Sequence, residues 1–91
     1  MAKPGRTASF SWPKYGDLVK NARKRMGYGN RADFVAHVKE TTGTEILEGT
    51  LRSIERGNVA PKADQFIAIN ICIFGDPMPK AMHEWFGGRR W

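Results

Sequence analysis

The apolar residues of this chain recur at helical spacing in successive segments, and a glycine or a proline interrupts each segment. The first stripe contains Leu18, Val19, Ala22 and Met26, and "GYG" at 27–29 ends it. No segment alternates apolar and polar residues over a useful length, so no strand is predicted. The pattern predicts an all-α fold of four to five short helices.

Glycines and capping residues set the expected bounds of the first two helices. The first helical period begins at Tyr15, and Asp17 is its candidate cap. Asn30 is a good N-cap for a second helix, "RADFVAHVKETT" at 31–42. Gly43 is expected to end that helix in a left-handed conformation.

The third helix is expected within "EILEGTLRSIER" at 45–56, with Thr44 as a candidate cap and Gly57 at its end. Its inward positions are Ile46 or Leu47, followed by Leu51 and Ile54.

Two further helices are expected after Pro61, which suits the first turn of a helix. The fourth, at 62–74, is apolar on most sides, and this predicts a central position in the bundle. A short fifth helix is expected within "KAMHEWF" at 80–86.

The length of 91 residues fits one domain. Residues 1–15 are predicted to form a flexible basic arm, residues 16–86 the domain, and residues 87–91 a tail. Cys72 is the single cysteine, so no internal disulfide can form, which fits a cytoplasmic protein. The longest apolar run, at 66–74, is too short to cross a bilayer, and no membrane partner is expected.

The positive charge of the chain lies in its first part. Residues 1–39 contain nine Lys or Arg and two acidic residues, whereas residues 40–91 contain six and seven. The net charge of +6 therefore arises before residue 40. Such an asymmetry favours a polyanionic partner such as nucleic acid, although a solubilising surface has the same composition.

Catalytic motifs are not recognisable in this sequence. No Gly-x-Ser-x-Gly elbow occurs, and Cys72 has no histidine at a catalytic spacing. His37 and His83 lie far apart and lack neighbouring cysteines, so no metal site is predicted. We therefore expect no enzyme, no cofactor and no small-molecule ligand.

Four segments carry a resemblance to a known family: "ARKRMG", "NRADFVAHV", "LRSIERGNVAP" and "FIAINICIF". They resemble the Cro/repressor-type helix-turn-helix domain (lambda repressor-like, XRE) of phage and bacterial regulators. The resemblance covers residues 17–74 and implies a lambda repressor-like fold. It departs from the family in an extended turn between the second and third helices, so the third helix could start at Glu45 or nearer Glu48.

The resemblance also implies a structural ion pair between Arg23, four residues before Gly27, and Glu55 in "IERG". Such a pair would fix the first helix against the third. A solvated Glu55 between Arg52 and Arg56 is the alternative.

Laid on this sequence, the family pattern places DNA-binding residues on and around the third helix. Arg52 can bond guanine O6 and N7 together, or can contact a phosphate, or can pair with Glu48 or Glu55 on the protein surface. A glycine at 49 is explained either by close approach to DNA or by packing against another helix. Arg31, at the start of the second helix, is a candidate phosphate ligand. The full candidate set is Lys3, Arg6, Lys14, Arg31, Glu48, Gly49, Thr50, Arg52, Ser53, Asn58 and Lys62.

The resemblance implies a small transcriptional repressor that occupies an operator on double-stranded DNA in the cytoplasm, which is that of the host if the chain is phage-encoded. A homodimer on DNA is expected, with Met82, Trp85 and Phe86 as a candidate dimer surface, although these residues could instead close the core. The basic arm could contact DNA or serve as a solubilising tail. The alternative function is a protein-interaction module, such as the DNA-binding antitoxin of a toxin–antitoxin pair.

Overall fold

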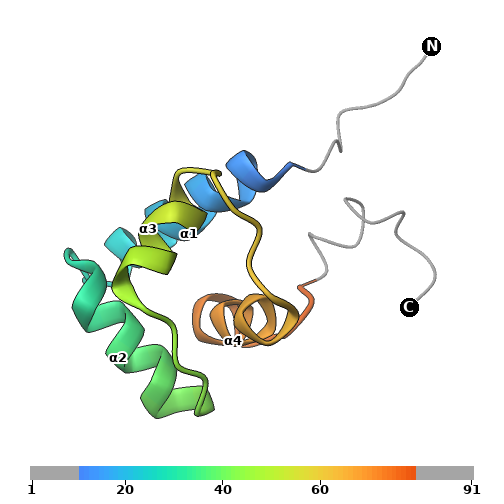
Figure 1. The fold of residues 1–91 in the computed structure, drawn as a ribbon. Helices are drawn as coiled ribbons and strands as arrows, with labels where there is room; N and C mark the ends of the chain where they lie inside the picture. The colour runs from blue at the N-terminus through green and yellow to red at the C-terminus, as the bar shows by residue number, and fades with distance from the viewer. Residues whose placement is uncertain (1–10, 80–91) are drawn as a thin grey trace.

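A computed structural model describes residues 11–79 of the chain, and these residues contain four helices and no strand. The helices are α1 (Trp12–Arg25), α2 (Arg31–Thr42), α3 (Glu48–Glu55) and α4 (Ala63–Phe74). Figure 1 shows α3 beside α1, with α2 and α4 completing the bundle. The predicted all-α class is confirmed for this part of the chain. The expected fifth helix, its dimer surface and the tail lie outside the described residues.

Helix α1 begins earlier than the sequence analysis predicted. Ser11 is its N-cap, and the Ser11 hydroxyl accepts a hydrogen bond from the backbone N–H of Lys14 at 3.2 Å. Pro13 occupies the first turn, where its missing N–H needs no partner. The prediction of Asp17 as cap was therefore wrong, because Ser11 followed by a proline is the stronger start signal.

Helix α2 has the predicted bounds. The Asn30 side chain accepts a hydrogen bond from the backbone N–H of Asp33 at 2.9 Å. Gly43 ends the helix with φ +81°, a left-handed conformation that favours glycine.

Helix α3 starts at Glu48, so the later of the two expected starts is the observed one. Thr44 does not cap it, because the N-cap is Leu47, whose side chain makes no capping hydrogen bond. Ile46 is buried in the core and Leu47 is 67% exposed, so Ile46 is the inward residue of that pair. The extended turn of the sequence analysis is the non-helical stretch 43–47.

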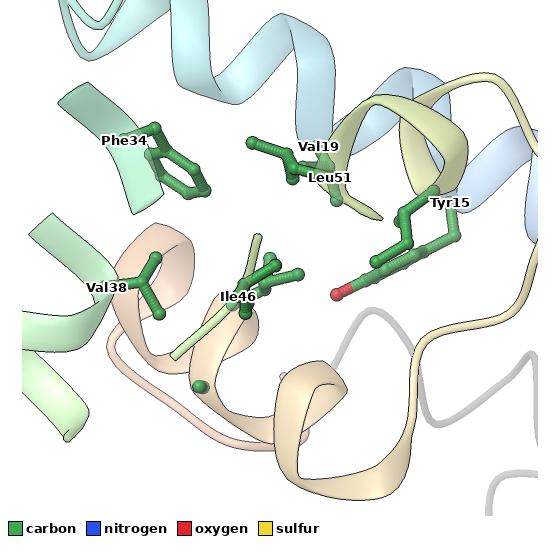
Figure 2. Packing of buried hydrophobic residues seen from close by; sticks show 9 residues of the cluster. Tyr15, Val19, Phe34, Val38, Ile46 and Leu51 are labelled. Atoms are coloured by element: carbon green, nitrogen blue, oxygen red, sulfur yellow. The ribbon is translucent and has the colours of Figure 1, made fainter. Parts of the chain in front are cut away.

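The core forms where the four helices meet. Figure 2 shows its buried side chains, which come from every helix and from the stretch before α3. At the contact between α1 and α3, Gly16 lies against the backbone carbonyls of Ile54 and Glu55, where a Cβ would collide with both oxygens. This close approach holds α3 directly on α1. The core residues are Tyr15, Val19, Phe34, Val38, Ile46, Leu51, Ile54, Ala68 and Ile69.

Helix α4 is not enclosed, contrary to the prediction of a central helix. It buries Ala68, Ile69 and Asn70, but Ile67 is 44% and Phe74 39% exposed. The sequence pattern was misleading because Ile67 and Phe74 are apolar although they lie on the solvent-exposed side of the helix. No helix within residues 11–79 is long and apolar enough to span a membrane.

Buried hydrogen bonds join α1, α4 and the segment after α4. The Tyr15 hydroxyl donates to Asn70 Oδ1 at 2.8 Å, and Asn70 Nδ2 donates to the Pro77 carbonyl at 2.9 Å. This role of Asn70 was not predicted from the sequence, where the residue lies within an apolar run. Each buried polar atom of the amide thus has a partner, as burial requires.

Candidate functional site

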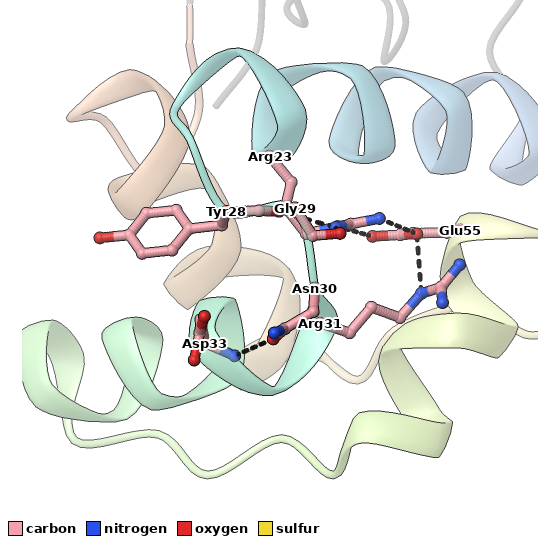
Figure 3. Close-up of polar contacts among 7 residues, drawn as sticks. All are labelled: Arg23, Tyr28, Gly29, Asn30, Arg31, Asp33 and Glu55. Carbon is pink, nitrogen blue, oxygen red and sulfur yellow. Dashed lines mark hydrogen bonds and ion pairs between the residues drawn. The ribbon is translucent and has the colours of Figure 1, made fainter.

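Helices α1, α2 and α3 are joined by a cluster of charged side chains (Figure 3). Arg23 Nε lies 2.8 Å from Glu55 Oε2, and Arg23 Nη2 lies 3.2 Å from Glu55 Oε1. Both side chains are almost fully buried. The structure therefore places the two residues of the expected ion pair in contact. Their geometry is bidentate, which fixes the relative orientation of the two side chains.

Arg23 also satisfies the backbone that leads into α2. Its Nη1 donates to the carbonyl oxygens of Tyr28 at 2.7 Å and Gly29 at 2.9 Å. The "GYG" segment after α1 is thus fixed by the same side chain that holds α3. A buried guanidinium has five N–H donors, and this site uses four donor contacts on three acceptor groups.

Arg31, the first residue of α2, contacts Glu55 Oε1, the oxygen that also accepts from Arg23 Nη2. Its Nε lies 3.0 Å from Glu55 Oε1, and its side chain is 25% exposed. The residues described give its two terminal nitrogens no hydrogen bond, so these donors remain available at the surface. Glu55 therefore orients a partly exposed arginine at the N-terminus of a helix.

Helix α3 has a fixed side and a free side. Leu51, Ile54 and Glu55 are buried, whereas Glu48, Gly49 and Arg52 are exposed. Within residues 11–79, no hydrogen bond or ion pair joins Arg52 to another side chain, and so the pairing of Arg52 with Glu48 or Glu55 is not observed. Its guanidinium is free to bind an external ligand.

Gly49 lies on the free side, in open space. A Cβ added there would meet no atom of the described residues within 4 Å. Close packing against another helix, one of the two explanations considered for this glycine, is therefore not seen in the part of the chain that the structure describes.

An open groove of about 700 Å³ runs beside the free side of α3. The candidate residues Gly49, Thr50, Ser53 and Lys62 line it, together with Glu45, Leu47, Val59, Ala60 and Gln65. Its walls come from the stretch before α3, from α3 itself, and from the loop and first turn of α4. The groove therefore brings together candidate residues that are far apart in the sequence.

The remaining candidates are less closely grouped. Asn58 is exposed in the loop after α3, where its backbone N–H donates to the Ser53 carbonyl at 3.0 Å. Lys14 lies in the first turn of α1 rather than in a flexible arm. Lys3 and Arg6 lie outside the described residues. Residues 11–79 contain no cluster of His, Cys, Asp or Glu suited to a metal ion.

Leu47 and Val59 are members of the groove that the sequence analysis missed. Leu47 is 67% and Val59 45% exposed, which is unusual for large apolar side chains. The sequence did indicate that Leu47 is unusual. Leucine is a poor N-cap, and of the neighbouring residues Ile46 and Leu47 only one was expected to face the core. For Val59, the turn at 57–58 pointed only to a loop.

Comparison with models of protein families, with curated proteins and with solved structures found no match to this chain.

Proposed function

We propose that this chain binds double-stranded DNA at specific sequences, through α3 in the major groove, as a small repressor that acts by occupying its operator. The observation that carries the proposal is the division of α3 into a buried side and a free side. One face of the helix is held by Leu51, Ile54 and Glu55, and the other presents Gly49 and Arg52 to solvent. A helix that reads base edges needs this combination of rigid support and an unobstructed outer face.

The buried cluster supports this role through its geometry. Glu55 receives Arg23 from α1 and Arg31 from α2, so the orientation of α3 depends on both neighbouring helices. The guanidinium of Arg31 stands at the start of α2 and contacts Glu55 through Nε (Figure 3), and the described residues give its terminal nitrogens no hydrogen bond. A phosphate bound there would also meet the first-turn N–H groups of α2 that Asn30 does not cap.

The chemistry of the groove and of the exposed residues beside it fits the edge of a DNA duplex. The Thr50 and Ser53 hydroxyls can donate or accept, and Arg52 can bond guanine in a bidentate manner. Lys62, at the N-cap of α4, and Asn58 in the preceding loop are suited to the phosphates that flank such a contact. Each class of contact in a protein–DNA interface thus has a candidate residue on this face.

The net charge divides between the described residues and the chain ends. Residues 11–79 contain ten Lys or Arg and eight Asp or Glu, which gives +2 of the total +6. Residues 1–10 and 80–91 therefore carry the other +4. We expect the ends of the chain to supply much of the salt-dependent attraction to DNA, and the face of α3 to supply the selectivity.

Selection of binding sites from a pool of random duplexes, repeated over a series of salt concentrations, tests the proposal. The expected result is enrichment of a common site whose affinity falls steeply as salt increases. A two-fold symmetric site would agree with binding as a homodimer. Failure to enrich any common site, even at low salt, would contradict sequence-specific binding.

A protein-interaction module, such as an antitoxin, is the second candidate. The observation that favours it is the apolar side of α4, where Ile67 and Phe74 are exposed. An Ile67→Asp variant distinguishes the two functions. It should retain DNA binding if α4 serves a separate purpose, because Ile67 does not line the groove beside α3.

A further inference from the structure

The groove beside α3 contains two exposed apolar side chains that the proposed contacts do not use. Leu47 is 67% exposed at the N-cap of α3, and Val59 is 45% exposed in the loop before α4. Both line the same groove as Gly49, Thr50 and Ser53. The two residues are 12 positions apart in the sequence, and the fold brings them to the same groove.

Leu47 is unfavourable in the free protein for two separate reasons. At the N-cap, Ser, Thr, Asp or Asn would accept a hydrogen bond from the first turn, whereas Leu47 makes no such bond. Its side chain is also left largely in water, although the neighbouring Ile46 is buried. Local choices that oppose stability in this way are typical of functional positions.

The surroundings of these two side chains indicate what covers them. The groove also presents hydroxyls, an unobstructed glycine backbone and Lys62, and Arg52 is exposed on the same helix. A ligand that matches this mixture has apolar spots among hydrogen-bonding groups and anionic edges. The major groove has this character, because the C5 methyl group of thymine is its apolar feature among donors and acceptors.

We infer that Leu47 and Val59 are specificity-determining residues that select thymine by contact with its C5 methyl group. The inference rests on the proposed function, and it names the chemical group that the groove beside α3 would recognise. The two side chains become buried against methyl groups when α3 lies in the major groove, which offsets their exposure in the free protein. The site would then carry thymine at the positions opposite Leu47 and Val59, beside the bases read by polar side chains.

Replacement of single thymines by deoxyuridine tests this inference, because it removes the methyl group and leaves base pairing and charge unchanged. Each thymine of the site selected from random duplexes is replaced in turn, and the Kd is measured for the full chain. Replacement at one or two positions should weaken binding about three- to fivefold, the effect of burying one methyl group. In Leu47→Ala, deoxyuridine at one of these positions should leave the Kd nearly unchanged. In Val59→Ala, deoxyuridine at the other position should leave the Kd nearly unchanged.

Ile67→Ala is the matched control, since Ile67 is 44% exposed on α4 but does not line the groove. This variant should retain the full response to deoxyuridine. Leu47→Ser is a second variant that offers a capping hydroxyl to α3, so it should keep or raise the thermal midpoint while it loses the response. This separates recognition of thymine from a role in folding.

The outcomes distinguish this inference from the proposed function. A selected site without thymine, or one whose affinity is insensitive to every deoxyuridine, would overturn the inference and leave sequence-specific binding intact. A response that persists in both Leu47→Ala and Val59→Ala would also overturn it. The absence of any selected site would overturn the proposed function itself, and the inference with it.

Discussion

Arg23 and Glu55 form a buried bidentate ion pair that joins the last turn of α1 to the last residue of α3, with Nε and Oε2 2.8 Å apart. Arg31 of α2 contacts the same carboxylate at 3.0 Å. Because three helices meet at Glu55, this side chain helps to fix the orientation of α3, together with the packing of Leu51 and Ile54.

Removal of the carboxylate should destabilise the fold strongly. Glu55→Ala leaves the Arg23 guanidinium buried without its anionic partner, and we expect a loss of about 3–5 kcal/mol in the free energy of unfolding. Arg23→Met alone should have a comparable effect. Urea denaturation of both variants and of Arg23→Met/Glu55→Leu measures the coupling, and the double variant should lose less than the sum of the two single variants. Additive losses would contradict a coupled buried pair.

Stability at high pH should depend on Tyr15. Burial raises the pKa of the Tyr15 phenol above its ordinary value of 10.0, because the charged form would lose its hydration. The folded state therefore binds this proton more tightly than the unfolded state. This difference contributes fully to the free energy of unfolding below pH 10, and the contribution falls as the pH rises above 10. The decrease attributable to Tyr15 should be about 1.4 kcal/mol per pH unit.

Tyr15→Phe is the variant that isolates this group. It should be less stable at neutral pH by about 1–3 kcal/mol, since Asn70 Oδ1 then lacks its donor. Its disadvantage relative to the natural sequence should shrink as pH rises from 10 to 11. If the free energy of unfolding fell equally in the two proteins as the pH rises, Tyr15 would not be the group responsible for the decrease.

Gly49→Ala should separate folding from DNA binding. The added methyl group meets no described atom, and alanine in a helix is favoured over glycine by about 0.5–1 kcal/mol, so the thermal midpoint should rise. If DNA approaches this backbone closely, affinity for the selected duplex should fall. An increase in stability with unchanged affinity would remove Gly49 from the interface.

Gly16→Ala serves as the contrasting variant for Gly49→Ala. A Cβ at Gly16 would lie 2.6 Å from the Glu55 carbonyl oxygen and would also collide with that of Ile54. The thermal midpoint should therefore fall, because α1 and α3 must move apart. The opposite signs expected at the two glycines check the packing of α3 on α1.

The extent to which sequence predicted this fold follows from the range of the interactions involved. Helix α2 was predicted to the residue, because Asn30 and Gly43 act within one turn of its ends. The Arg23–Glu55 pair was anticipated only through a family resemblance, since 32 residues separate its members. The burial of Asn70 could not be anticipated, because its partners Tyr15 and Pro77 come from separate parts of the chain.

In the candidate site too, positions set by one helix were predictable, whereas positions set by contacts between segments were not. Arg52 and Gly49 could be placed on the outer face of α3 because Leu51 and Ile54 define the inner one. The groove could not be predicted, since Val59 and Lys62 reach it from the loop beyond the helix. The exposure of Leu47 depends on Ile46 filling the core, which helical periodicity alone left undecided.

Arg52 and Arg31 should differ in how their loss affects binding. Arg52→Ala should weaken binding to the selected duplex by about 1–3 kcal/mol and relax the preference at one base pair. Arg31→Ala should weaken binding to all duplexes and reduce the salt dependence by about one phosphate contact. Titrations of each variant with selected and scrambled duplexes provide the comparison. A lower thermal midpoint without a change in base preference would exclude Arg52 from recognition.

The central claim is that α3 confers sequence-specific binding, and the ratio of Kd values for a scrambled and a selected duplex tests it most directly. Measured for the full chain at one salt concentration, this ratio should be about a thousand or more, as in specific protein–DNA complexes. It should fall at least about fivefold in Arg52→Ala while the variant remains folded. A ratio near one for the natural sequence would contradict the claim.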